Sequence, residues 1–490
     1  MRLQYLPFSS QTAALSSAIS LTTAVGLSAN SQEANRYNVL LICVDDLRPE
    51  LGCMGAGYAR TPNIDKLAES ARLFTSHYVQ VPTCGASRFA LLTGISPKKS
   101  HALSNHALYK GKNALKQNGN PKGAQSLPEL FHRSGYHTTC IGKVSHTPDG
   151  KVFNYDGSGD GRPELPGAWD ELATPYGPWK YGWGIFFAYA NGHHREDGRG
   201  IRPVMQFPDV SDSELPDGML ADAAIKAIRT NKDKRFFIAV GFIKPHLPFV
   251  APKRYWDMYE NAKIPLPPNP RKTSAYAHNS GECYGYQFPF KKTHPLSDSA
   301  TLELRRAYLA CASYTDAQVG KVLNELKQQG LSDNTIVILW GDHGWHLGDN
   351  AVWGKHTPLE YALRSPLIIR VPKMAQPGTP TAALVETIDI YPTLIDICQP
   401  TYRKTAAPLD GSTLTNLINK PDTIHGRCAV SYWHGSTSVR NENYRLIIPA
   451  SGNRRPLELY DHRVDPEEAH NIAKQHPEVV ANLKKLAQER

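Results

Sequence analysis

A cysteine followed four residues later by an arginine is the first feature of this sequence that could do chemistry. The stretch Val81–Arg88 places Cys84 at the start of an expected short helix, with Arg88 one helical turn further on. Free amides at a helix N-terminus and a nearby guanidinium both favour negative charge. The pattern therefore predicts chemistry on a sulfate, phosphate or carboxylate, although an isolated cysteine of this kind more often opens an ordinary helix.

Four apolar runs in the sequence end in charged or imidazole side chains. The runs are residues 37–44, 136–141, 236–240 and 335–340, and the side chains that follow them are Asp45, Asp46, Lys143, His146, His246, Asp342 and His343. Helical patterns alternate with these runs, which predicts an α/β fold with a mainly parallel sheet covered on both faces. Because parallel strands end at one edge of a sheet, we expect these side chains to converge there on an active site.

Three of these side chains are carboxylates, Asp45, Asp46 and Asp342. Carboxylates that converge at a buried site must be paired or metal-bound. Oxygen-rich ligation favours calcium or magnesium, and a flexible set of carboxylates favours calcium. His343 could add a nitrogen ligand or donate to the bound anion instead, and ligand types alone leave transition metals open.

Residues Cys84–Arg88 also fit the cysteine–x–proline/alanine–x–arginine signature of type I sulfatases. Ala86 stands where proline is commoner in that family, which leaves the identity of the maturase open. Further segments resemble iduronate-2-sulfatase and its bacterial relatives: residues 38–49, 61–68, 91–94, 142–144, 244–249 and 342–345, Lys355, and the closing stretch 459–471.

The resemblance implies an alkaline-phosphatase-like sandwich and oxidation of Cys84 by a maturase to formylglycine, an aldehyde that hydrates to a geminal diol. By the same resemblance, the calcium ligands are Asp45, Asp46, Asp342, His343 and the oxidised Cys84. Arg88, Lys143 and His146 match residues that hold and polarise formylglycine, while His246 and Lys355 match groups that contact the sulfate and its leaving oxygen.

The domain organisation is predicted from changes in composition along the 490 residues. Residues 1–29 are typical of a secretory signal peptide, so we expect a periplasmic or secreted protein. Residues 30–400 are the expected catalytic domain. Beyond Pro400 the sequence becomes polar and rich in turn-forming residues, and the runs 428–433, 444–448 and 457–460 predict short antiparallel strands before a helix from about Pro477. Residues 401–490 are therefore expected to form a smaller α+β subdomain.

Composition narrows the class of partner. No run after the signal peptide is apolar for the roughly 20 residues that a membrane helix needs, so we expect no membrane span. The formal net charge of +10 suits an anionic polymer, and the spread of Lys and Arg without a basic block argues against nucleic acid. The eight cysteines contain no Cys-x-x-Cys pair, which argues against a zinc ribbon or a dense disulfide scaffold.

Together these features predict an exported, calcium-dependent formylglycine sulfatase that removes O-sulfate from an acidic sulfated polysaccharide or its oligosaccharides. The resemblance leaves algal polymers such as ulvan and glycosaminoglycans open as substrates. Two alternatives remain: a phosphate or phosphonate ester hydrolase of the same superfamily, and a non-catalytic glycan-binding protein in which Cys84 stays a thiol.

Overall fold

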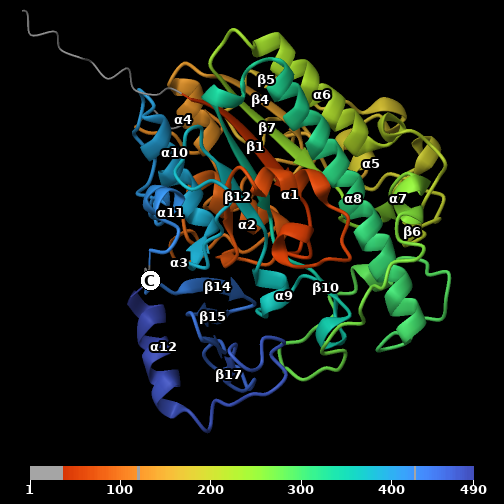
Figure 1. Cartoon of the computed structure of the whole chain (residues 1–490), viewed down its shortest axis with the longest axis vertical. Coiled ribbons are helices and arrows are strands. Elements are labelled where there is room, and N and C mark those ends of the chain that lie inside the picture. The colour runs from red at the N-terminus through yellow and green to blue at the C-terminus, as the bar shows by residue number, and fades with distance from the viewer. Residues whose placement is uncertain (1–36, 119–121, 424–425, 490) are drawn as a thin grey trace, which may run out of the picture. The chain divides into compact units, whose positions relative to one another are not determined.

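A mixed sheet of seven strands forms the middle of the molecule (Figure 1). The computed structural model describes residues 37–118, 122–423 and 426–489, so the expected signal peptide lies outside the described residues. In order across the sheet the strands are β2 (Arg72–Phe74), β12 (Leu367–Arg370), β9 (Thr335–Gly341), β1 (Asn38–Val44), β7 (Phe236–Phe242), β4 (His137–Gly142) and β5 (Glu171–Leu172). Neighbours from β9 to β5 are parallel, and only β12 runs against its neighbours, which confirms the mainly parallel sheet.

The central strand β1 is apolar on both faces because both faces are covered. All seven of its residues are buried, as the continuous apolar run predicted. Leu41 lies between Ala239 of β7 and Ile338 of β9 in the sheet register. Alternate residues of β1 pack into two different hydrophobic cores. Leu40 belongs to the core on one face of the sheet, and Leu41 belongs to the core on the other face.

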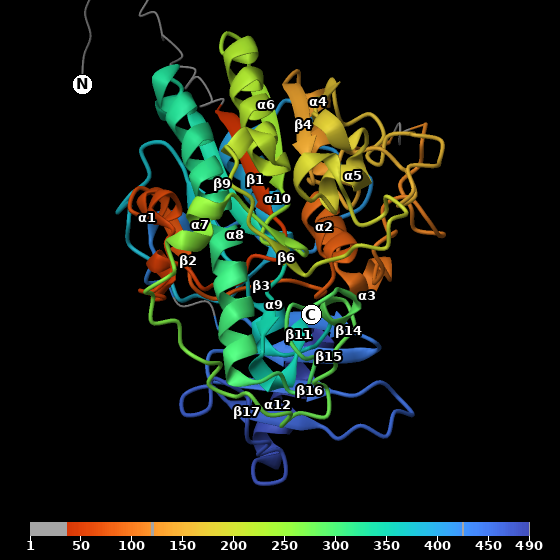
Figure 2. The ribbon, with the colours of Figure 1, turned by 90° about the vertical axis from the view of Figure 1, so that its right-hand side faces the viewer.

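Helices pack on both faces of this sheet (Figures 1 and 2). One core contains residues of α1 (Pro62–Ala68), α6 (Pro216–Asn231) and α8 (Asp298–Gln328). The other contains residues of α2 (Cys84–Thr93), α4 (Leu127–Arg133), α10 (Ile390–Cys398) and α11 (Thr415–Asn419). No helix in the described ranges is long and apolar enough to cross a membrane.

Helix α8 begins earlier than the apolar periodicity of residues 304–329 indicates. Its N-cap is Ser297, whose hydroxyl accepts a hydrogen bond from the amide of Ala300 at 3.3 Å. This cap satisfies a free amide of the first turn and fixes the start of the helix there.

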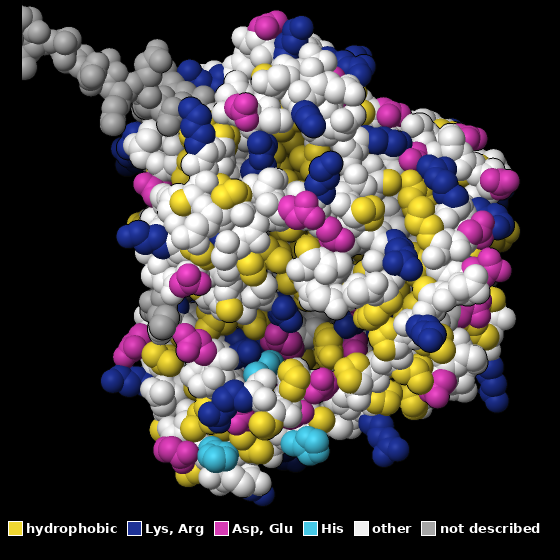
Figure 3. Space-filling view, in the orientation of Figure 1, with side chains coloured by type: hydrophobic (Ala, Val, Ile, Leu, Met, Phe, Trp, Pro, Cys, Tyr) yellow, Lys and Arg dark blue, Asp and Glu magenta, His cyan; other side chains and the backbone are white. Residues whose placement is uncertain are grey.

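Short elements complete the catalytic part of the chain. The short helices are α3 (Pro97–Ser100), α5 (Gly182–Phe186), α7 (Lys253–Asp257) and α9 (Glu360–Leu363), and the two-stranded pairs are β3 (His77–Tyr78) with β13 (Val385–Glu386), β6 (Met205–Gln206) with β8 (Phe249–Val250), and β10 (His346–Leu347) with β11 (Trp353–Gly354). Lys and Arg are interspersed with Asp and Glu over the face shown in Figure 3.

The end of the chain forms the expected antiparallel sheet and helix. The strands are β14 (Ala429–Trp433), β15 (Ser436–Arg440), β16 (Tyr444–Ile448) and β17 (Glu458–Asp461), and α12 (Pro477–Glu489) packs against them through Leu483. Strand β15 was not predicted, because its Ser and Thr residues hide the apolar alternation. The two-residue turn His434–Gly435 has φ of +46° and +76°, the backbone typical of a tight hairpin, and its glycine was the available signal in the sequence. The division of the chain at residue 400 stays a prediction.

A buried arginine connects this C-terminal sheet to the catalytic part. Arg445 of β16 is 1 % exposed and forms ion pairs with Glu360 of α9 and with Glu468. Burial alone would raise the pKa of Glu360, but Arg445 holds that pKa below its usual value. The Nε2 atom of His462 lies 2.9 Å from Glu468 and extends the network. The two carboxylates are thus neutralised by protein groups.

Replacement of this arginine tests the connection. Arg445→Ala leaves two buried carboxylates without their main partner, so we expect the free energy of unfolding to fall by about 3–5 kcal/mol in urea denaturation. Arg463→Ala is the matched control, because Arg463 pairs with Asp461 at the surface of the same sheet with its side chain 54 % exposed. A loss for Arg445→Ala no larger than for the control would contradict a stabilising role.

Candidate active site

Two adjacent carboxylates, Asp45 and Asp46, follow directly after β1. Asp45 and Asp46 are at most 1 % exposed. The chain turns at Asp46, where φ is +59°, a left-handed conformation that Asp tolerates better than most residues. The hydroxyl of Tyr308 on α8 donates to the carbonyl oxygen of Asp46 at 2.7 Å, and the amide of Asp46 donates to Oδ1 of Asp342 at 3.0 Å. The turn is therefore held from both sides.

Helix α2 delivers Cys84 to this edge of the sheet. Every residue of the helix is buried, and its first turn packs tightly against another backbone segment. A Cβ atom on Gly85 would lie 2.1 Å from the carbonyl oxygen of Asn105, so only glycine fits there. The side-chain oxygen of Asn105 accepts a hydrogen bond from the amide of Gly85 at 2.9 Å. This packing fixes where the helix, and with it Cys84, begins.

Arg88 connects the ends of three strands. Its Nη2 atom lies 3.0 Å from Asp45 after β1 and 3.0 Å from Asp342 after β9. Its Nη1 atom donates to the carbonyl oxygens of Lys143 and Val144, just after β4. All three charged side chains of the ion pairs are fully buried. Arg88, the arginine of the signature, therefore also holds Asp45 and Asp342 in place.

Asp45 and Asp46 each form an ion pair with a different lysine. Lys143 Nζ lies 2.7 Å from Asp45, and Lys355 Nζ lies 2.9 Å from Asp46. Burial alone would raise the pKa of Asp45, but Lys143, together with His246 and Arg88, holds that pKa well below its usual value. Asp45 is therefore ionised.

The carboxylates and neighbouring donors form a group that fits a divalent cation. Ligand atoms of Asp45, Asp46, Cys84, Asp342 and His343 belong to overlapping clusters whose members lie within 4.8 Å of one another. Oδ2 of Asp46 is buried without a hydrogen-bond partner among the described residues. Burial raises the pKa of Asp46 and of Asp342, and Asp45 raises both further. A bound cation would compensate this concentration of negative charge.

Two histidines lie beside this group. His246 Nε2 lies 3.8 Å from Asp46, and burial, with Lys355, lowers the pKa of His246 to about 3. Both ring nitrogens of His146 are buried without a hydrogen-bond partner in the part of the chain that the structure describes. Burial and Lys143 keep the pKa of His146 well below its usual value, so the ring is neutral and has a free nitrogen for a ligand.

The structure thus brings together all ten residues that were predicted from the sequence, although their individual roles stay predictions. Three further residues were missed. Glu282 contacts His246 and Lys355, His356 Nε2 lies 3.3 Å from Thr83 Oγ1, and Asn105 packs on Gly85. Glu282 and Asn105 come from irregular segments without a motif, so the sequence offered no signal for them, whereas His356 directly follows the predicted Lys355, and that adjacency was the available signal.

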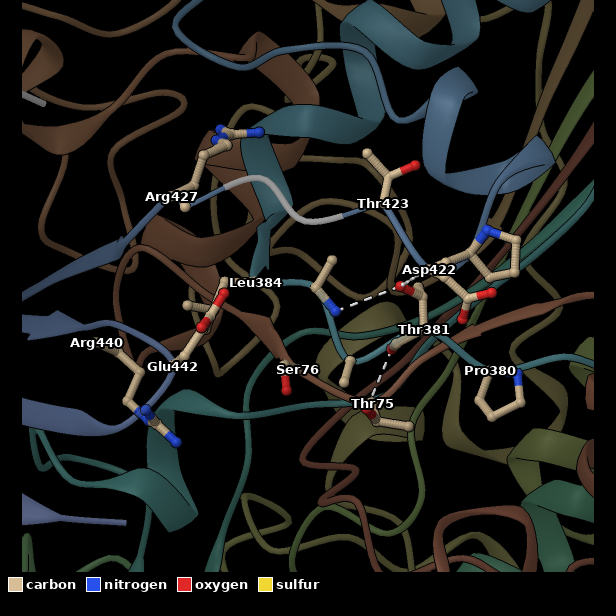
Figure 4. Close-up of a pocket in the computed structure, with 14 residues that line it drawn as sticks. Thr75, Ser76, Pro380, Thr381, Leu384, Asp422, Thr423, Arg427, Arg440 and Glu442 are labelled. Carbon is tan, nitrogen blue, oxygen red and sulfur yellow. Dashed lines mark hydrogen bonds between the residues drawn. The ribbon is translucent and has the colours of Figure 1, made fainter. Parts of the chain in front are cut away.

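A separate cavity of about 540 Å³ contains none of the predicted catalytic residues in its described lining (Figure 4). Thr75 at its edge donates to the carbonyl oxygen of Thr381 at 3.1 Å, and Arg427 forms an ion pair with Asp389 at 3.1 Å. Because the predicted catalytic residues lie outside the described lining of this cavity, we assign the chemistry to the cluster around Cys84.

A buried group of carboxylates, lysines and imidazoles lies around a helix-borne cysteine at the carboxyl edge of a parallel sheet, an arrangement suited to the hydrolysis of anionic esters. Sequence comparison identifies which class of ester hydrolase this is. Residues 37–399 match the sulfatase family, and residues 341–490 match the C-terminal region of N-sulphoglucosamine sulphohydrolase. The chain belongs to the sulfatase family and is an enzyme of sulfate ester hydrolysis.

Individual relatives agree with this assignment. The chain is 29 % identical to a sulfatase of Formosa agariphila, over 90 % of this chain and 84 % of the relative. It is 30 % identical to iduronate 2-sulfatase of Mus musculus, over 73 % of this chain and 68 % of the relative. The fold is also that of the phosphonate monoester hydrolase of Agrobacterium radiobacter, with a TM-score of 0.73 and 23 % identity over 92 % of this chain and 95 % of the other. The alkaline-phosphatase-like fold class is thereby confirmed.

Proposed function

We propose that this protein removes O-sulfate from an acidic sulfated polysaccharide or its oligosaccharides, with Cys84 converted to formylglycine and calcium bound beside it. The observation that carries the proposal is the position of Cys84. Its Sγ atom lies 3.3 Å from His343 and belongs to the same clusters as Asp45, Asp46 and Asp342.

The unmodified thiol is poorly suited to attack an ester. Burial, with the negative charge of Asp45, raises the pKa of Cys84 to about 12. The thiol is therefore protonated at neutral pH, whereas the thiolate is the nucleophilic form of cysteine. Formylglycine would supply a geminal diol at this position, with one oxygen to attack sulfur and a second hydroxyl to expel the sulfate afterwards.

Fixed cations at the site favour an anionic substrate. Arg88 and Lys143 form ion pairs with Asp45, and Lys355 forms ion pairs with Asp46 and Glu282. Such preorganised charges stabilise the negative charge that develops on a sulfuryl group during transfer. They act without reorganisation because each is already held by a buried carboxylate.

We infer that His246 and Lys355 assist the leaving oxygen. Burial alone would lower the pKa of Lys355, but Asp46 raises it well above its usual value, so this lysine stays charged and can neutralise an alkoxide. His246 is neutral in the free site. An incoming anion favours its protonated form, which can then donate a proton to the departing sugar oxygen.

A divalent ion would be held by Asp45, Asp46, Asp342 and His343, together with the oxidised residue 84. The ion would supply charge neutralisation for the sulfuryl group. Mainly carboxylate oxygens at a wide site favour calcium over zinc.

The class of substrate is supported by the relative named iduronate 2-sulfatase, which suggests a sulfated sugar acid. Algal polysaccharides such as ulvan and glycosaminoglycans both offer such sugars. Export to the periplasm or beyond, inferred from residues 1–29, would place the enzyme where these polymers occur. A formylglycine-generating maturase is then a required partner.

Replacement of the nucleophile tests the proposed function. For Cys84→Ala we expect kcat on sulfated oligosaccharides to fall at least roughly 1,000-fold, because no diol can form. Binding of the same oligosaccharides, measured by calorimetry, should persist because Arg88, Lys143 and Lys355 remain. Mass spectrometry of the active wild-type protein should show the mass loss of aldehyde formation on the peptide that contains Cys84.

Cys53→Ala is the matched control, since Cys53 is a free, partly exposed cysteine outside the cluster. Near-normal turnover by Cys84→Ala would disprove the proposed mechanism. Full binding of sulfated glycans by a protein with an unmodified Cys84 and no turnover would instead support a glycan-binding protein. Strong preference for phosphate esters would favour the phosphate or phosphonate hydrolase.

Removal of the metal tests the choice of calcium. Prolonged chelation is expected to abolish turnover, because the repulsion among Asp45, Asp46 and Asp342 is then uncompensated. Added calcium should restore the rate more fully than zinc, as measured by sulfate release and by recovery of the thermal unfolding midpoint. Recovery with zinc or manganese alone would overturn the assignment of calcium.

A further inference from the structure

Glu282 is a carboxylate of the active site that belongs to none of the sequence motifs. It precedes the short turn Cys283–Gly285 in the irregular segment between α7 and α8. Its Oε1 atom lies 3.1 Å from Nε2 of His246 and 3.3 Å from Nζ of Lys355. Its Oε2 atom is buried without a hydrogen-bond partner among the residues that the structure describes. A negative charge is thus held beside His246 and Lys355, the two groups that would assist the leaving oxygen.

This carboxylate changes the balance of fixed charge in the site. The lysines and arginine are Arg88, Lys143 and Lys355, and the carboxylates in contact with them are Asp45, Asp46, Asp342 and Glu282. In the free site, where His246 is neutral, three positive charges therefore face four negative ones, and a divalent ion would leave one net positive charge. Without Glu282 the net charge would be two.

The net charges of sulfate and phosphate monoesters differ by about the same amount, one unit of charge. A sulfate monoester carries a single negative charge, whereas a phosphate monoester carries nearly two above its second pKa of about 6. Both have a tetrahedral group of similar shape, so charge is the main property by which a rigid site can separate them. Interactions between charges are strong at a site from which water is excluded.

We propose that Glu282 makes the site select singly charged esters, and so sulfate over phosphate, by cancelling the additional positive charge beside Lys355. The inference rests on the proposed sulfatase function and explains how a fold shared with phosphonate ester hydrolysis could reject phosphate monoesters. Glu282 also positions His246 and Lys355 through its Oε1 atom. Glutamine in its place keeps the size and one acceptor oxygen but removes the charge.

The test compares three esters of 4-nitrophenol at pH 8: the sulfate, the doubly charged phosphate and the singly charged phenylphosphonate. In Glu282→Gln, the ratio of kcat/KM for the phosphate to kcat/KM for the sulfate should rise about tenfold or more over the wild type. Glu282→Asp retains the charge and should keep this ratio within about threefold of the wild type even if both rates fall. Glu478→Gln removes a carboxylate that is 68 % exposed on α12 and serves as the control for overall charge.

A phosphate-to-sulfate ratio in Glu282→Gln that equals the wild-type ratio would overturn the inference. A second measurement needs no variant: the wild type should hydrolyse the phenylphosphonate with a higher kcat/KM than the phosphate, and the reverse order would also overturn it. Failure of the proposed function has a different signature, because the wild type would then release no sulfate from any sulfate ester while the phosphate comparison could still be made.

Discussion

The buried ion pairs of Arg88 with Asp45 and Asp342 are the interaction on which the rest of the site depends. All three side chains are fully buried, so each charge is stable only while its partners stay in place. The same arginine reaches the backbone that follows β4, and its helix carries Cys84. One side chain therefore fixes the relative positions of Cys84 and two carboxylates.

The surrounding fold buries these ion pairs and keeps the partners together. The carboxylates follow central strands that are buried on both faces, and helix α2 has no exposed residue. Lys143 neutralises Asp45, and Lys355 neutralises Asp46. The negative charge that remains is what a divalent cation would compensate, so the fold, the ion pairs and the proposed metal site are parts of one electrostatic arrangement.

The sequence predicted the sheet and most of the site because both depend on local patterns. Continuous apolar runs marked the buried strands, and the charged residues directly after them had to meet at one edge. Glu282 and Asn105 were missed because they reach the site from irregular segments, where only tertiary packing decides which side chain points inward. Strand β15 was missed because its Ser and Thr residues leave almost no alternation between apolar and polar positions. The two buried carboxylates around Arg445 likewise had no signal, since their partners lie far apart in the chain.

The central claim is that the ester is broken by attack on its sulfur atom rather than on the sugar carbon. Hydrolysis of a sulfated oligosaccharide in water enriched in heavy oxygen tests it most directly, because mass spectrometry shows which bond was broken. Attack on sulfur places heavy oxygen in the released sulfate and leaves the sugar hydroxyl unlabelled. Heavy oxygen in the sugar hydroxyl, with unlabelled sulfate, would show cleavage of the carbon–oxygen bond and contradict the account.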